Sequence, residues 1–114
     1  MMLHEAGVFP SRGDQCLEVG FGTLGWLGEL IAWGVRESDL HGIEILPDRV
    51  AHVREILPLA DLRVGDAWAL PWEDDTFFVV IASTLFSSIL DARLRGRAAE
   101  EVTRVLRPGG ALLW

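Results

Sequence analysis

The sequence has a single cysteine and few cationic side chains, and each shortage excludes a class of protein. Cys16 stands alone among 114 residues, so no disulfide framework and no cysteine metal pair can be built from it. Lys and Arg number 10 against 17 Asp and Glu, which gives a formal net charge of -7. Binding to a nucleic-acid backbone needs clustered cations, so we expect no nucleic-acid partner. The local group Arg93, Arg95 and Arg97 is interpreted as a solvated helix face.

Long apolar runs and metal-ligand spacing are also missing. No apolar run approaches 18 residues, which predicts that the chain does not span a membrane. His4, His41 and His52 lack the spacing of metal ligands, so no metal site is expected. The start of the sequence has no basic region followed by an apolar segment, and we therefore expect no signal peptide and a cytoplasmic location. Half of the residues are hydrophobic, which favours one folded domain over residues 1–114.

A glycine-rich turn near the start is the feature around which the rest is arranged. Cys16 to Val19 reads as a buried strand, and Gly20 and Gly22 allow a tight turn that a ligand can approach closely. Residues 23–33 then carry apolar side chains at helical spacing. A strand, a glycine turn and a helix start together favour electron-rich ligand atoms, as in nucleotide-binding sites. The spacing of Gly20, Gly22 and Gly25 is a weak signal when taken alone.

The remaining sequence alternates strands with helices. We predict strands at 40–43, 62–64, 77–82 and 111–114, a helix from Pro47 to Leu57, and a helix that Asp91 caps and the segment 107–110 ends. This alternation predicts an α/β fold: a three-layer α/β/α Rossmann-like sandwich whose parallel strands have the order 3-2-1-4-5. Its ligand belongs at the carboxyl ends of the strands, beside strand one.

Three acidic residues fall at the carboxyl ends of successive strands. Glu44 lies 24 residues after Gly20, where a carboxylate can accept both hydroxyls of a ribose. Asp66 follows strand three and can accept a bond from an adenine amino group. Glu18 lies just before the glycine turn, where it can meet an ammonium group. A cofactor with ribose, adenine and an amino-acid tail would use all three, so the pattern favours S-adenosyl-L-methionine.

These residues resemble the class I S-adenosylmethionine-dependent methyltransferases. The segment 18–22 looks like the family's first motif, 42–48 like its second-strand acidic motif, 65–72 like its adenine-side segment and 106–110 like the turn before its fifth strand. The resemblance covers residues 15–114. It implies a cofactor site made of Glu18, Gly20, Phe21, Gly22, Glu44, Ile45, Asp66, Ala67 and Ser83.

The resemblance also implies an activity, methyl transfer to a small-molecule acceptor, but no catalytic residue. Methyl transfer from a sulfonium needs an aligned nucleophile, and positioning can supply much of the acceleration. Three departures from the family pattern stand out. Leu24 occupies the usual place of the third glycine, where it is expected to crowd the methionine tail or tilt the helix. Phe78 replaces a common aspartate, and the family's last two strands are absent from the sequence.

Two other functions stay open at this point. A nicotinamide-dinucleotide domain shares the glycines and Glu44 but leaves Glu18 and Asp66 without a role. A non-catalytic binding or interaction module fits the missing strands. The same feature predicts a homodimer, because the apolar segment from Ala111 to Trp114 would form an edge strand that lacks Lys or Pro protection.

Overall fold

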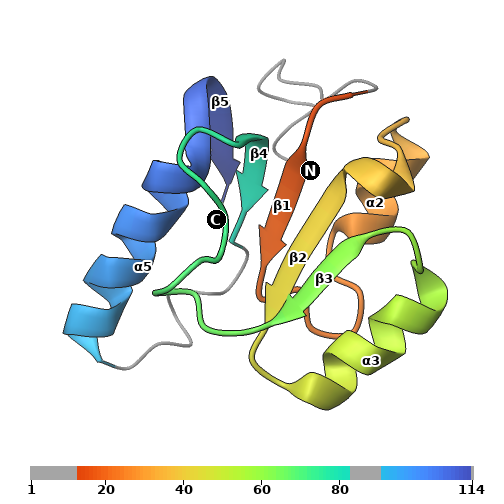
Figure 1. The fold of residues 1–114 in the computed structure, drawn as a ribbon, viewed down its shortest axis with the longest axis horizontal. Helices are drawn as coiled ribbons and strands as arrows, with labels where there is room; N and C mark the ends of the chain where they lie inside the picture. Colours follow the sequence, from red (N-terminus) through yellow and green to blue (C-terminus); the bar gives the residue numbers. More distant parts are fainter. Residues whose placement is uncertain (1–12, 83–90, 114) are drawn as a thin grey trace.

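The computed structural model describes residues 13–82 and 91–113 (Figure 1). Its elements, in chain order, are β1 (Cys16–Val19), α2 (Leu27–Ala32), the 3-10 helix η1 (Glu37–Asp39), β2 (Leu40–Glu44), α3 (Pro47–Ile56), β3 (Asp61–Val64), β4 (Phe77–Ile81), α5 (Ala92–Val105) and β5 (Leu106–Leu113). The strands join into one sheet of order β3-β2-β1-β4-β5, and every described pair is parallel. The predicted strand order is confirmed.

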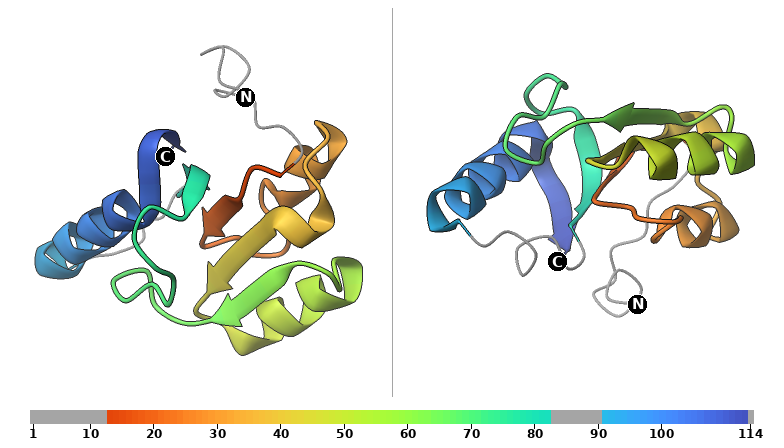
Figure 2. Two further views of the ribbon diagram at one scale, coloured as in Figure 1. Left: turned by 45° about the horizontal axis from the view of Figure 1, so that its top comes forward. Right: turned by 90° about the horizontal axis from the view of Figure 1, so that it is seen from below.

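The two faces of the sheet carry separate apolar clusters. Cys16 of β1 packs with Leu27 and Leu30 of α2 and with the apolar residues of α3, whereas Leu17 and Val19 pack with α5. Successive side chains of a strand point to opposite faces, so one short buried strand serves both clusters. The views in Figures 1 and 2 place α5 beside β5 at one end of the sheet and α3 beside β3 at the other. The three-layer arrangement is therefore present.

Two element boundaries differ from the sequence prediction, and both differences have a backbone cause. Helix α2 begins at Leu27 rather than at residue 23, because Gly22 and Gly25 both adopt a φ of 61°, which no right-handed helix contains. Strand β5 begins at Leu106 rather than Ala111. Leu106 is already extended and pairs with Phe77, and a register shift between Phe77 and Val79 lets the strand continue past the glycines.

The helix ends follow their local chemistry. The carboxylate of Asp91 accepts the backbone N–H groups of Arg93 at 2.8 Å and Leu94 at 3.3 Å, which confirms it as the cap of α5. Gly34 follows α2 with a φ of 103° and donates its N–H to the carbonyl of Ile31. No helix within residues 13–82 and 91–113 has the length and apolar character needed to cross a bilayer.

Candidate functional site

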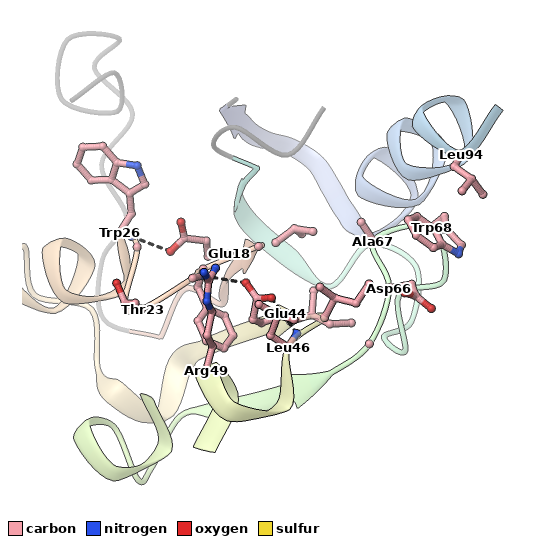
Figure 3. Close-up of a pocket in the computed structure, with 18 of the residues that line it drawn as sticks. Glu18, Thr23, Trp26, Glu44, Leu46, Arg49, Asp66, Ala67, Trp68 and Leu94 are labelled. Atoms are coloured by element: carbon pink, nitrogen blue, oxygen red, sulfur yellow. Dashed lines mark hydrogen bonds between the residues drawn. The ribbon is translucent and has the colours of Figure 1, made fainter. Parts of the chain in front are cut away.

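A pocket of about 800 Å³ opens at the carboxyl ends of β1 and β2 (Figure 3). Its walls come from the glycine loop after β1, the β2–α3 turn, the segment after β3 and the start of α5. Eight of the nine predicted cofactor residues line it: Glu18, Gly20, Phe21, Gly22, Glu44, Ile45, Asp66 and Ala67. The ninth, Ser83, lies outside the described residues. The carboxyl ends of the parallel strands thus bring together residues that are up to 49 positions apart in the sequence, from Glu18 to Ala67.

Glu44 is fixed at the end of β2 by two backbone donors. Its Oε1 accepts the N–H of Gly22 at 3.1 Å, and its Oε2 accepts the N–H of Leu46 at 2.9 Å. The side chain is buried, and the N–H of Gly20 also binds the carbonyl of Ile43 in the same strand, so the glycine loop is tied to β2 at two points. Each carboxylate oxygen has a further lone-pair direction, which leaves acceptor capacity for a ligand.

Glu18 is the most strongly perturbed acid of the site. It is 1 % exposed, and its Oε1 accepts the N–H of Trp26 at 2.7 Å. Burial raises the pKa of this carboxyl to about 8, against the opposing effect of the backbone N–H groups of Trp26 and Leu27. A carboxyl in this state gains its negative charge when a cation arrives beside it. The position is therefore suited to an ammonium or other cationic group.

Gly25, the third glycine of the loop, leaves room for the carboxylate of Glu18. A Cβ at Gly25 would lie 2.7 Å from Cδ of Glu18, and the residue also has a φ of 61°. The glycine is required at position 25 for both reasons. Leu24 does not line the described pocket; it packs against the core cluster of α2, with its Cδ2 3.2 Å from where a Cβ of Gly28 would lie. The side chain of Leu24 is thus placed against the core, and its effect on the methionine tail or on the tilt of the helix stays a prediction.

The far end of the pocket carries apolar side chains together with Asp66. Ile45 is 57 % exposed although it is a large aliphatic residue, and it faces the cavity together with Asp66, Ala67 and Trp68. An exposed aliphatic side chain at the mouth of a pocket offers a surface for a flat ring. Trp68 contributes to the same wall.

Two aromatic residues near the site have structural roles. The Trp72 ring makes edge contacts with His41 and Phe77, its Nε1 donates to Asp61, and Trp72 is not among the described lining residues. Phe21 reaches the pocket edge but is 1 % exposed, and its ring sits where a Cβ of Gly42 would be.

The segment that carries Asp66 and Trp68 is held by α5. Arg104 donates to the carbonyls of Leu70 at 3.0 Å and Trp72 at 2.9 Å, while Glu101 accepts the N–H of Leu70 at 2.8 Å. Arg104 also pairs with Glu101 and Asp74. Residues 65–76 contain no helix or strand, so these side-chain bonds fix their course.

Several pocket residues were not identified from the sequence. Trp26 contributes a backbone N–H, for which the residue type gives no signal. Arg49 and Leu94 reach the pocket from the first turns of α3 and α5. The positions just after a strand-end acid are the signal that points to Arg49, and the cap at Asp91 is the signal that points to Leu94.

Comparison with known proteins adds independent findings. A family model described as a methyltransferase domain matches residues 16–110. A probable S-adenosylmethionine-dependent methyltransferase of Mycolicibacterium smegmatis is 35% identical over 101 residues, which are 89% of this chain and 37% of that protein. A phosphatidylethanolamine N-methyltransferase of Cereibacter sphaeroides is 31% identical over 109 residues, covering 90% of this chain and 50% of that protein.

A solved structure gives the same result for the fold. The crystal structure of an S-adenosylmethionine-dependent methyltransferase from Methanosarcina mazei superposes with a TM-score of 0.82 at 25% identity, over 97% of this chain and 54% of that chain. The present chain thus spans about half, or less, of the length of these three proteins.

Proposed function

Because this chain belongs to the methyltransferase domain family, we propose that it binds S-adenosyl-L-methionine at the carboxyl ends of β1 and β2 and serves methyl transfer to a small-molecule acceptor. One observation carries the proposal: Glu18 and Glu44, from neighbouring strands, both face one pocket and are both held by N–H groups of the same glycine loop. A plain glycine turn needs neither carboxylate.

Glu44 fits the ribose of such a cofactor. A ribose offers two adjacent hydroxyl donors, and the carboxylate of Glu44 keeps one acceptor direction on each oxygen after its bonds to Gly22 and Leu46. Those two backbone bonds hold the group in a single orientation before the ligand arrives. A preorganised acceptor loses little side-chain entropy on binding.

Glu18 and the far wall fit the two ends of the cofactor. The buried carboxyl of Glu18 suits the ammonium of the methionine moiety. The positive charge of the ammonium favours the ionised carboxylate, which burial alone disfavours. Ile45, Ala67 and Trp68 suit the adenine ring, and Asp66 at the same wall suits its amino group. The pocket contains no metal ligand set within the described residues, and its acids tolerate a sulfonium.

The bound cofactor supplies an electrophilic methyl group on a positively charged sulfur. The residues described here bind and orient that group, while the acceptor has to be aligned by other parts of the protein as well. A small-molecule acceptor agrees with the net charge of -7, which opposes a polyanionic substrate. A cytoplasmic location is proposed on the lone, buried Cys16.

Calorimetric titration with S-adenosylmethionine and with NAD tests the proposal. We expect saturable binding of S-adenosylmethionine and none of NAD. Glu44→Ala should weaken binding by about 1.5–3 kcal/mol, the usual range for bonds to a charged group, and leave the fold intact. Binding of NAD alone, or unchanged affinity in a folded Glu44→Ala variant, would contradict the assignment.

A homodimer is the second part of the proposal. Among the described residues β5 has one neighbouring strand, β4, and lies at the end of the sheet order. A second copy could pair with its other side through a twofold axis. Sedimentation of the 114-residue chain at micromolar concentration, with Leu113→Lys as the disrupting variant, measures this directly. A monomer at all concentrations would exclude the dimer.

A further inference from the structure

Arg49 is a cation in a pocket whose other ionisable lining residues are acids. It is the third residue of α3, and the described lining residues include Glu18, Glu44, Asp66 and Asp91 but no second Lys or Arg. A guanidinium in this setting lowers the local negative potential at one point of the wall. It therefore gives the pocket a position that attracts an anion.

The position of the guanidinium is defined by the glycine loop. Its Nη1 lies 3.8 Å from the place where a Cβ of Gly22 would be, and no other described residue beyond the two chain neighbours of Gly22 comes within 4 Å of that place. Figure 3 shows the Arg49 side chain extending from α3 toward the loop, on the side of Glu44. Glu18 approaches the same loop at Gly25 and Trp26. A carboxyl group and a guanidinium group thus reach one short loop, from β1 and from α3.

The donors of Arg49 are not used within the described part of the chain. No hydrogen bond or ion pair engages its guanidinium there, and the side chain is exposed. Five other arginines bind internal partners: Arg36, Arg54, Arg63, Arg104 and Arg107. Glu44 accepts the N–H groups of Gly22 and Leu46, and no ion pair joins it to Arg49. Arg49 therefore has the donors that a planar anion such as a carboxylate accepts in pairs.

We propose that Arg49 binds the α-carboxylate of the ligand's amino-acid end, so that Arg49 and Glu18 together select a zwitterionic group at the glycine loop. This inference rests on the proposed binding of S-adenosylmethionine. It assigns to Arg49 a selectivity that neither the glycines nor Glu44 can provide, because those groups contact parts shared with ligands that lack the carboxylate.

Decarboxylated S-adenosylmethionine is the matching probe, since it keeps the adenosine, the sulfonium and the ammonium and lacks only the carboxylate. Calorimetry with both compounds on the wild type and on Arg49→Gln gives a cycle that isolates the contact. We expect the variant to bind S-adenosylmethionine about tenfold more weakly, the lower end for a bond between charged groups because the site is exposed. Its affinity for the decarboxylated compound should be unchanged or higher.

Arg97→Gln is the matched control. Arg97 is an exposed arginine of α5 outside the described pocket wall, so its loss changes the net charge equally and should leave both affinities unchanged. Arg49→Lys should recover part of the lost affinity, because it keeps the charge without the paired donors. Circular dichroism checks the fold of each variant.

The outcomes separate the two proposals. An equal loss for both compounds in Arg49→Gln would overturn the inference, because Arg49 would then contact the adenosine part. Equal affinity of wild type and variant for S-adenosylmethionine would also overturn it while leaving the proposed function intact. Failure of the wild type to bind S-adenosylmethionine at all would instead remove the proposed function.

Discussion

Two features of the structure require a glycine at position 25: the backbone conformation there and the neighbouring carboxylate of Glu18. Its φ of 61° disfavours any side chain, and a Cβ would also collide with the Glu18 carboxylate. Gly34 has a similar backbone constraint, with a φ of 103°, but nothing lies within 4 Å of its Cβ position. A comparison of Gly25 with Gly34 therefore separates the effect of backbone conformation from the effect of a collision with Glu18.

We expect Gly25→Ala to lose both stability and ligand affinity. The left-handed backbone alone costs about 1–2 kcal/mol for an alanine. The displaced Glu18 would in addition give up its bond to the Trp26 N–H. Gly34→Ala should show the first loss only, with unchanged binding of S-adenosylmethionine. Urea unfolding and calorimetry of the two variants measure these effects, and an unaffected affinity in Gly25→Ala would show that the position of Glu18 does not matter to binding.

Glu18 makes binding depend on pH in a definite direction. Burial raises its folded pKa to about 8, so the folded chain holds a proton there that the unfolded chain has released. This contribution to stability is therefore complete at low pH and is lost as the pH rises through the unfolded value toward about 8. A cationic ligand favours the ionised form and acts in the opposite sense.

Proton release on binding follows from this linkage. At about pH 6.5, association with S-adenosylmethionine should release a proton from Glu18, so affinity should rise with pH up to the folded pKa. Calorimetry in two buffers of different ionisation enthalpy counts the released protons. Glu18→Gln removes the titrating group and should abolish the release. A release that persists in this variant would assign the proton to another group.

At the scale of elements, the conformation of the segment 65–76 is fixed mainly by hydrogen bonds to α5. Arg104 holds the carbonyls of Leu70 and Trp72 and pairs with Asp74, and the N–H of Asp75 returns to the carbonyl of Arg104. The pocket wall at Asp66 and Trp68 lies at the start of this segment. Helix α5 therefore positions the pocket wall at Asp66 and Trp68 through Arg104, which does not itself line the described pocket.

Arg104→Gln should loosen that wall. The substitution removes the guanidinium that donates to two carbonyls and two carboxylates, which we expect to cost about 1–3 kcal/mol of stability. Hydrogen exchange should accelerate in residues 65–76 and remain unchanged in α3. Arg54→Gln is the control, because it gives up a comparable bond to the carbonyl of Leu62 on the other side of the sheet. Equal exchange in the segment for wild type and Arg104→Gln would show that the segment holds its own course.

The elements that follow one clear local signal were predictable, and those set by long-range contacts were not. The apolar run of β4 and the Pro47 and Asp91 helix starts were identified to within a residue. The start of α2 was misplaced because Gly22 and Gly25 both adopt a φ of 61°, a conformation that a glycine permits but that its presence in the sequence does not require. Arg104 was missed because its partners in the segment 65–76 lie 30 or more residues away and have no shared pattern with it.

At the scale of the molecule, the proposed ligand site joins parts that otherwise meet only through the sheet. Among the pocket residues, Phe21 belongs to one apolar cluster, whereas Val19, Ile43 and Ala67 belong to the other. A ligand that fills the pocket adds contacts between both clusters. It also neutralises part of the repulsion among the acids at the pocket wall.

Ligand binding should therefore raise the unfolding temperature of the whole chain. A ligand that binds only the folded state adds about 2.7 kcal/mol at one hundred times its dissociation constant. For a domain of this size that corresponds to a rise of about 10–20 °C. Differential scanning calorimetry with S-adenosylmethionine should show this rise as one cooperative transition, and NAD should produce none. Glu44→Ala should reduce the rise at the same ligand concentration. A split transition, with only part of the heat moving, would mean that the ligand contacts one apolar cluster and leaves the α5 side of the pocket unengaged.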